Sequence, residues 1–293
     1  QAHMFEWYGV VLMWKSSSPW SALRGFLYDY YLRQTGGFYG VKKALKGSLH
    51  VQMDALDDKL QEGSNSSSTG SNRSVRVINK SAARVDGMSV IVTCYSSTGV
   101  EVNSVTRTGI SLSGNTVLRY DTDLSLGTAS PSPHDLFFTD LELFDQTGTL
   151  LSSNVYWENH QDLAKLPLVS PTEHMSLRAE YRSDGRIDLE IHSKPQDQKN
   201  SAKNPAVFML IVSLVKGGGT NRLSPRNHAT DEQGEDHRIL PTFYSDNYLT
   251  LFSGQKVTVT VSCHHMTPSE LRDAGAALLV KAWNMEEIVV DIA

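Results

Sequence analysis

Candidate metal ligands come first, because paired histidines and clustered aspartates bind cations in many proteins. His264 and His265 are adjacent, but no second pair of ligands stands at a spacing that would complete a zinc site. Asp54, Asp57 and Asp58 form an acidic cluster that lacks the glycine and the glutamate of a calcium-binding loop. We therefore expect no metal site and no cofactor.

The other reactive side chains suggest no nucleophile. The two cysteines, Cys94 and Cys263, are far apart in the sequence, which excludes a disulfide framework, and we expect both to be buried free thiols. Serine and histidine are frequent, but no local pattern supports a Ser–His–Asp triad. We expect Glu6 to be a solvated helix residue and Asp29 to be a structural residue paired with a cation or with the backbone.

Charge and hydropathy exclude two further classes of protein. The formal net charge is −5 over 293 residues, and no basic stripe is interleaved with aromatic residues, so we expect no nucleic-acid partner. No apolar run approaches the roughly 18–20 residues that span a bilayer, so we expect no membrane partner.

The first fifty residues predict a strand, a loop and helix. Val10–Trp14 is a continuous apolar run, as in strands that are buried on both faces. Ser18 can cap a helix, and Pro19 suits the first turn. Apolar residues then recur at helical spacing at Trp20, Leu23, Leu27 and Tyr31. A second helix is predicted over Phe38–Lys46, with lysines near its C-terminus.

The remainder of the chain reads as β-strand. Short segments of alternating apolar and polar residues are separated by turn residues, the pattern of antiparallel sandwiches. We therefore predict a mostly β fold with two immunoglobulin-like β-sandwich domains, at 49–165 and 166–293, preceded by the βα unit at 1–48.

The opening strand has no partner in this sequence. A strand with two apolar faces needs parallel neighbours, and no other βα unit follows. We therefore expect the chain to be the C-terminal part of a larger protein, whose remaining α/β residues lie upstream or on a separate polypeptide.

Several motifs resemble glycoside hydrolase family 2. Residues 9–52 are similar to the last strand and helix of that family's (β/α)8 TIM barrel, through "GVVLMWKSSSPW", "LYDYY", "GFYGVKKA" and "LHVQ". "NRSVRVINKS" and "NVYW" resemble the sandwich after the barrel. "RILPTFYSDNYLTLFSGQKVTVTV" resembles the final sandwich of the branch with exo-β-D-glucosaminidases, β-mannosidases and plant mannosylglycoprotein endo-β-mannosidase.

The resemblance implies a division of labour between this chain and upstream residues. The family is retaining and uses two glutamates on earlier barrel strands, so we expect no catalytic residue in this chain and no activity from it alone. By resemblance, Trp14 forms the floor of a sugar subsite, and Lys15 donates a hydrogen bond at its mouth. Trp20 either borders the aglycone side or packs at a helix start. From the residues alone, Trp14 could equally fill the barrel, and Lys15 could equally be a solvated loop residue.

Two other motifs have simpler interpretations. Phe243–Tyr248 holds turn-forming residues between two predicted strands, and we expect a structural corner. Asn65, Asn72 and Asn79 begin glycosylation sequons, which favours a glycoprotein in the secretory pathway, in a vacuole or lysosome, or outside the cell.

The substrate prediction depends on which branch members the motifs resemble more. The loop at Trp14–Trp20 resembles plant endo-β-mannosidase, whereas Tyr28–Tyr31 and Val41–Ala44 resemble exo-β-glucosaminidases. We predict the C-terminal part or subunit of a retaining β-glycosidase that hydrolyses β-mannosidic linkages in oligosaccharides or glycans. One alternative is an exo-β-D-glucosaminidase, and another is a non-catalytic carbohydrate-binding β-sandwich protein.

Overall fold

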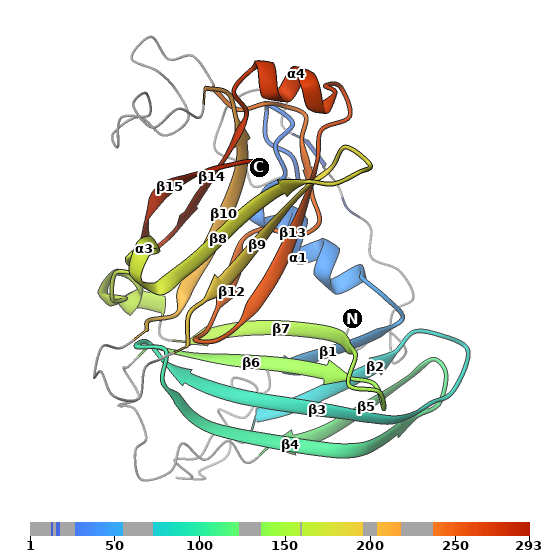
Figure 1. The fold of residues 1–293 in the computed structure, drawn as a ribbon. Coiled ribbons are helices and arrows are strands. Elements are labelled where there is room, and N and C mark those ends of the chain that lie inside the picture. Colours follow the sequence, from blue (N-terminus) through green and yellow to red (C-terminus); the bar gives the residue numbers. More distant parts are fainter. Residues whose placement is uncertain are drawn as a thin grey trace. The chain divides into compact units, whose positions relative to one another are not determined.

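The chain forms two compact units that are rich in antiparallel β-structure (Figure 1). The computed structural model describes residues 13, 16–17, 27–54, 73–122, 136–158, 160–195, 204–217 and 237–293. One unit comprises 1–13 and 41–165, and the other comprises 14–40 and 166–293. The division between them falls within helix α1 (Gly36–Leu45).

The first unit contains two antiparallel sheets. The three-stranded sheet has the order β1 (Leu49–Asp54), β2 (Arg73–Asn79) and β5 (Thr116–Thr122). The four-stranded sheet has the order β4 (Glu101–Leu112), β3 (Val85–Ser96), β6 (Phe137–Phe144) and β7 (Leu150–Glu158). A 3₁₀ helix, η1 (His160–Lys165), closes the unit in sequence.

The core of the first unit follows from the alternation of side chains along its strands. Val75 and Val77 of β2 and Val90 and Val92 of β3 are buried and belong to one hydrophobic cluster. Because successive side chains of a strand point to opposite faces, residues two apart share the core face. The alternation expected of these short strands is found in β3 as far as Val92, whereas in β2 the intervening Ser74 and Arg76 are buried as well.

The second unit contains two four-stranded antiparallel sheets. One has the order β12 (Leu249–Leu251), β10 (Val207–Val215), β14 (Ala277–Ala282) and β15 (Met285–Asp291). The other has the order β11 (Phe243–Tyr244), β13 (Lys256–Ser262), β9 (Ile187–Ser193) and β8 (Met175–Tyr181). Apolar residues of both sheets share one core cluster.

Two short helices complete the second unit. Helix α3 (Pro171–His174) precedes β8, and helix α4 (Pro268–Asp273) precedes β14. Thr267 caps α4 through a capping box with Glu270, which satisfies backbone donors that the first helical turn leaves free. None of the helices in the described residues is long and apolar enough to cross a membrane.

The predicted helices near the start have different outcomes. The helix expected over Phe38–Lys46 is confirmed as α1. The helix expected to continue through Leu27 and Tyr31 is wrong for the described residues, where Tyr28 forms isolated β-bridges with Ser17 and Gln34 and a turn follows. The carboxylate of Asp29 accepts backbone hydrogen bonds in this turn, which offers the chain an alternative to helix.

Candidate functional site

The predicted sugar-binding residues Trp14, Lys15 and Trp20 lie outside the described residues, as does Glu6. Next to them in sequence, Ser17 pairs in parallel with Tyr28, and the Tyr28 amide donates to the Ser16 carbonyl over 2.9 Å. Segment 27–40 is therefore the described neighbour of the predicted sugar-binding loop. The segment is attached to the second sandwich through residues of that sandwich's core.

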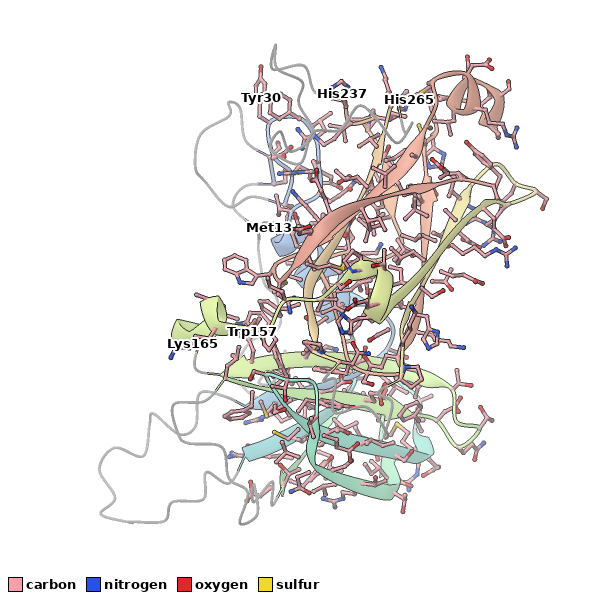
Figure 2. All side chains as sticks on the ribbon, turned by 60° about the vertical axis from the view of Figure 1, so that its left-hand side comes forward. Met13, Tyr30, Trp157, Lys165, His237 and His265 are labelled. Carbon is pink, nitrogen blue, oxygen red and sulfur yellow. The ribbon has the colours of Figure 1, made fainter. Side chains whose placement is uncertain are left out.

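A turn centred on Asp29 shapes the first half of segment 27–40. Asp29 Oδ1 accepts hydrogen bonds from the amides of Tyr31 and Arg33 at 3.0 and 2.9 Å. Asp29 Oδ2 accepts a third from Arg33 Nε at 2.9 Å. The exposed Tyr30 at the tip of this turn is labelled in Figure 2. The structural role predicted for Asp29 is confirmed, although the residue lies in a turn.

The second half of segment 27–40 belongs to the core of the second sandwich. Tyr39 is 2% exposed, and its ring centroid lies 5.8 Å from that of Tyr248. Burial raises the pKa of the Tyr39 hydroxyl well above its usual value, so it remains a neutral hydrogen-bond donor. A Cβ on Gly36 would lie 3.3 Å from Tyr248 Cδ1, so the close approach favours glycine there. This part of the segment is therefore held in place by packing.

The corner between β11 and β12 completes the hydrogen bonding of β10. Tyr244 Oη accepts from the Leu214 amide at 2.9 Å. Asn247 accepts from the Val212 amide and donates to the Val212 carbonyl, each at 2.9 Å. These side chains bond the backbone as a neighbouring strand would, which avoids buried unsatisfied groups. The prediction of a structural corner at Phe243–Tyr248 is confirmed.

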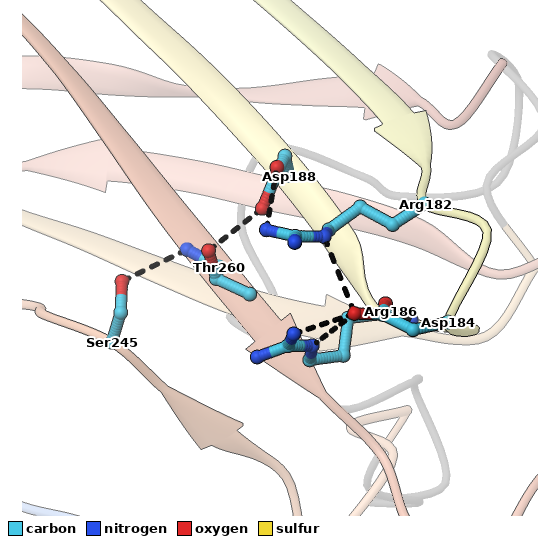
Figure 3. A network of polar contacts seen from close by, with 6 residues as sticks. All are labelled: Arg182, Asp184, Arg186, Asp188, Ser245 and Thr260. Carbon is cyan, nitrogen blue, oxygen red and sulfur yellow. Dashed lines mark hydrogen bonds and ion pairs between the residues drawn. The ribbon is translucent and has the colours of Figure 1, made fainter.

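A polar network lies on the sheet formed by β8, β9 and β13 (Figure 3). Asp184 pairs with Arg186 and Arg182, and the hydrogen bond from Arg186 is the main cause that lowers the pKa of Asp184 to about 2. Asp188 accepts from Arg182 at 3.3 Å and from Thr260 Oγ1 at 2.7 Å. The Asp184 carboxylate, whose pKa is lowered in this way, stays ionised and cannot serve as a general acid near neutral pH. We therefore interpret the network as a surface ion cluster.

Metal and thiol chemistry find no support in the described part of the chain. No group of three or more His, Cys, Asp or Glu residues there could hold a metal ion. Cys94 is a buried free thiol, as predicted, whereas Cys263 is free but only partly buried. Burial raises the pKa of the Cys263 thiol, which disfavours the reactive thiolate.

Asn79 is the one sequon asparagine among the described residues, since Asn65 and Asn72 fall outside them. Its side chain is fully buried. Nδ2 donates to the carbonyls of Ala83, Leu112 and Ser113 at 2.8, 3.3 and 3.1 Å. A glycan would have to attach to this nitrogen, so the folded structure argues against the glycosylation expected at Asn79.

The second sandwich also carries a groove that the sequence analysis did not predict. Its volume is about 870 Å³. Met209 and Ile211 of β10 and Val289 of β15 lie in it, on the sheet face opposite the core residues of these strands. Trp283, which is 63% exposed, and Glu286 also line it. A Trp-Asn pair between two apolar strands is a weak signal for such a feature.

Comparison with known proteins identifies the second sandwich. Residues 212–285 match the family model described as the exo-β-D-glucosaminidase Ig-fold domain. The second sandwich therefore contains an Ig-fold domain of the exo-β-D-glucosaminidase family. The match covers the corner and strands β11 to β14 in full, together with the end of β10 and the first residue of β15.

Curated relatives extend the similarity along nearly the whole chain. An exo-β-D-glucosaminidase of Streptomyces avermitilis is 28% identical over 97% of this chain and 29% of the relative. A mannosylglycoprotein endo-β-mannosidase of Lilium longiflorum is 24% identical over 98% of this chain and 32% of the relative. The chain thus spans about a third of the length of these relatives. The resemblance to this branch of glycoside hydrolase family 2 is confirmed.

Solved structures share the fold. An exo-chitosanase of Amycolatopsis orientalis superposes with a TM-score of 0.64 at 21% identity, over 94% of this chain and 30% of that one. A β-D-mannosidase of Dictyoglomus thermophilum gives a TM-score of 0.59 at 12% identity, over 93% of this chain and 26% of that one. The mostly β fold with an immunoglobulin-like sandwich is confirmed.

Proposed function

We propose that this chain is the C-terminal part or a subunit of a retaining β-glycosidase of glycoside hydrolase family 2, acting on β-D-glucosaminidic bonds at chain ends. The observation that carries this proposal is the similarity to exo-β-D-glucosaminidases along nearly the whole chain, together with the Ig-fold domain at residues 212–285. We propose that the catalytic glutamates lie on upstream residues or on a partner polypeptide, and that this chain alone is inactive.

In this proposal the chain contributes to substrate binding rather than to bond cleavage. Trp14 would stack against a sugar ring, Lys15 would donate to a hydroxyl, and Trp20 would border the aglycone side. The support is the anchoring of segment 27–40, whose residue Tyr39 is buried in the core of the Ig-fold domain's sandwich. An anchored neighbour limits how far the loop can move, and catalysis is sensitive to displacements of about 1 Å.

A second candidate is an endo-β-mannosidase of the same branch. The observations that favour it are the similarity to the lily enzyme over 98% of this chain and the resemblance of the loop at Trp14–Trp20. Mannose and glucosamine differ at C2, and the residues that would read that position are expected upstream. We place the glucosaminidase first because the family model of the Ig-fold domain carries its name.

The test compares two chromogenic substrates with two preparations. The chain alone, and the chain with the upstream residues or partner that accompany it in its source, are each assayed on p-nitrophenyl β-D-glucosaminide and β-D-mannoside. We expect hydrolysis of the glucosaminide by the second preparation only. Hydrolysis by the chain alone would overturn the division of labour. A chain that is stable and monomeric alone, with no hydrolysis in either preparation, would favour the carbohydrate-binding alternative.

A variant tests the proposed sugar contact. Trp14→Ala should lower kcat/KM for the preferred substrate about 100-fold, because a stacking surface next to the broken bond positions the reacting atoms. Trp157→Ala is the matched control, since this tryptophan of β7 is 37% exposed in the first sandwich (Figure 2). Equal effects of the two substitutions would contradict the role proposed for Trp14.

A further inference from the structure

The groove on β10, β14 and β15 has the size of a ligand site. Its volume of about 870 Å³ falls within the range of roughly 300–1,000 Å³ that is usual for small-molecule sites. Met209, Ile211 and Val289 provide an apolar floor, and these side chains are only partly buried. The groove therefore offers an apolar surface to a ligand without unfolding any strand.

Trp283 projects from a hairpin whose backbone is fixed. The Trp283 amide donates to the Phe208 carbonyl at 2.8 Å, although the side chain is 63% exposed. The indole and the apolar side chains of the groove together form an exposed apolar patch, and such patches often mark binding sites. A tryptophan side chain has only two rotatable χ angles, so its ring loses little conformational entropy when it stacks on a ligand.

Asn284 is the residue that fixes this hairpin. It is 3% exposed, and its Oδ1 accepts from the Phe208 amide at 3.0 Å. Its Nδ2 donates to the carbonyls of Pro167 and Ala206 at 2.8 and 2.9 Å. The Asn284 carbonyl accepts from the Val169 amide at 2.8 Å. Four hydrogen-bonding partners thus hold one residue next to an exposed tryptophan.

The charges in the groove favour a cationic ligand. Two residues with carboxylates, Glu286 and Glu287, line the groove together with one lysine, Lys281. Glu286 is exposed and therefore accessible from solvent. The lining carries one net negative charge, which attracts a cation and repels an anion. A tryptophan next to these carboxylates adds attraction for cations through its ring face.

We infer that this groove binds an oligosaccharide of β-linked glucosamine units. A pyranose ring offers a C–H face to Trp283, and a protonated 2-amino group can pair with Glu286. A neutral hexose meets the first requirement but not the second, and an acidic sugar would be repelled. The choice of an amino sugar as the ligand rests on the proposed glucosaminidase function. The assignment of a sugar-binding site to the groove does not depend on that function.

The test measures binding rather than hydrolysis. The full chain, in the polypeptide or complex in which it occurs, is titrated calorimetrically with glucosamine hexamer at mildly acidic pH, and with N-acetylglucosamine hexamer and mannohexaose. Measurements use catalytically inactivated protein, so that turnover does not contribute. We expect the glucosamine hexamer to bind most tightly and its affinity to fall as salt concentration rises.

Substitutions assign the binding to the groove. Trp283→Ala should weaken binding of the glucosamine hexamer about tenfold. Glu286→Gln should weaken it about threefold and leave binding of the N-acetylated hexamer unchanged. Phe243→Ala is the matched control, because Phe243 is 41% exposed on the same sandwich but does not line the groove. We expect this control to bind as the unsubstituted protein does.

Each contrary result has its own meaning. Undiminished binding in Trp283→Ala would overturn the assignment of the ligand to this groove. Equal binding of all three oligosaccharides would overturn the amino-sugar selectivity. Loss of an associated polypeptide in Trp283→Ala would overturn the proposal in favour of a protein partner. Binding that depends on Trp283, in a protein whose uninactivated form hydrolyses no glucosaminide, would uphold the groove while the proposed function fails.

Discussion

The two sandwiches share an architecture but use their polar residues differently. In the first, His50 and Asn79 are buried and bond to groups within the same unit. In the second, Asn247 and Asn284 fix the corner and the groove hairpin, which carry the surface features. The second sandwich also includes Tyr39 of segment 27–40 in its core. Two units of the same fold can therefore differ in which of them carries a candidate site.

The largest effect should come from Tyr39. Tyr39→Ala should lower the free energy of unfolding of the second sandwich by about 3–5 kcal/mol, because it removes a large buried ring from a packed core. Hydrogen exchange of the β10 and β14 amides measures the loss of stability in the second sandwich. Exchange of the β3 and β6 amides reports on the first sandwich. Tyr30→Ala is the control, since Tyr30 is 50% exposed on the same segment. An equal loss of stability in both sandwiches would contradict the assignment of Tyr39 to the core of the second sandwich.

A smaller effect should follow loss of Asn79 in the first sandwich. Asn79→Ala should lower the free energy of unfolding of the first sandwich by about 3 kcal/mol. The substitution leaves the buried carbonyls that accept from Nδ2 without that donor. Ser81→Ala is the matched control, because it also destroys the sequon but leaves the Asn79 amide in place. The Ser81 hydroxyl donates to Asn79 Oδ1 at 2.7 Å, and we expect its loss to lower the free energy of unfolding by about 1 kcal/mol.

Mass analysis of the protein from its source completes this test. We expect Asn79 to carry no glycan, since its side chain is fully buried. A glycan found on Asn79 would contradict the structural role and would place this residue at the surface. The two substitutions would then destabilise the protein equally, through loss of the sugar.

The smallest of the three effects concerns pH and His50. This histidine is 4% exposed, and desolvation by burial is the main cause that lowers its pKa to about 4. The unfolded chain binds a proton near pH 6.5 and the folded chain does not, so stability falls as pH decreases from about 6.5 to 4. We expect a loss of about 2.5 kcal/mol from this residue over that range.

Urea denaturation at a series of pH values measures this contribution. His50→Gln should flatten the pH dependence of the first sandwich, because glutamine does not titrate. His192→Gln is the control, since His192 of β9 in the second sandwich is only partly buried. An unchanged pH dependence in His50→Gln would show that other groups of the first sandwich are responsible.

Local patterns predicted the strands and the second helix but not the turn at Asp29. Val75, Val77, Val90 and Val92 could be assigned to a core face from alternation alone. The failure at Leu27–Tyr31 arose because helical spacing says nothing about a side chain that bonds its own backbone. The prediction of a glycan at Asn79 has a related weakness, because a three-residue motif does not show whether its asparagine is buried.

The fold class and the similarity to glycoside hydrolase family 2 could be predicted from the residues alone. The burial of Asn79, the place of Tyr39 in the second core and the groove that Trp283 lines became visible only in the folded chain. The physical reason is the distance along the chain between partners. Asn284 bonds to groups 76 and 117 positions away, and no local pattern of residues encodes such contacts.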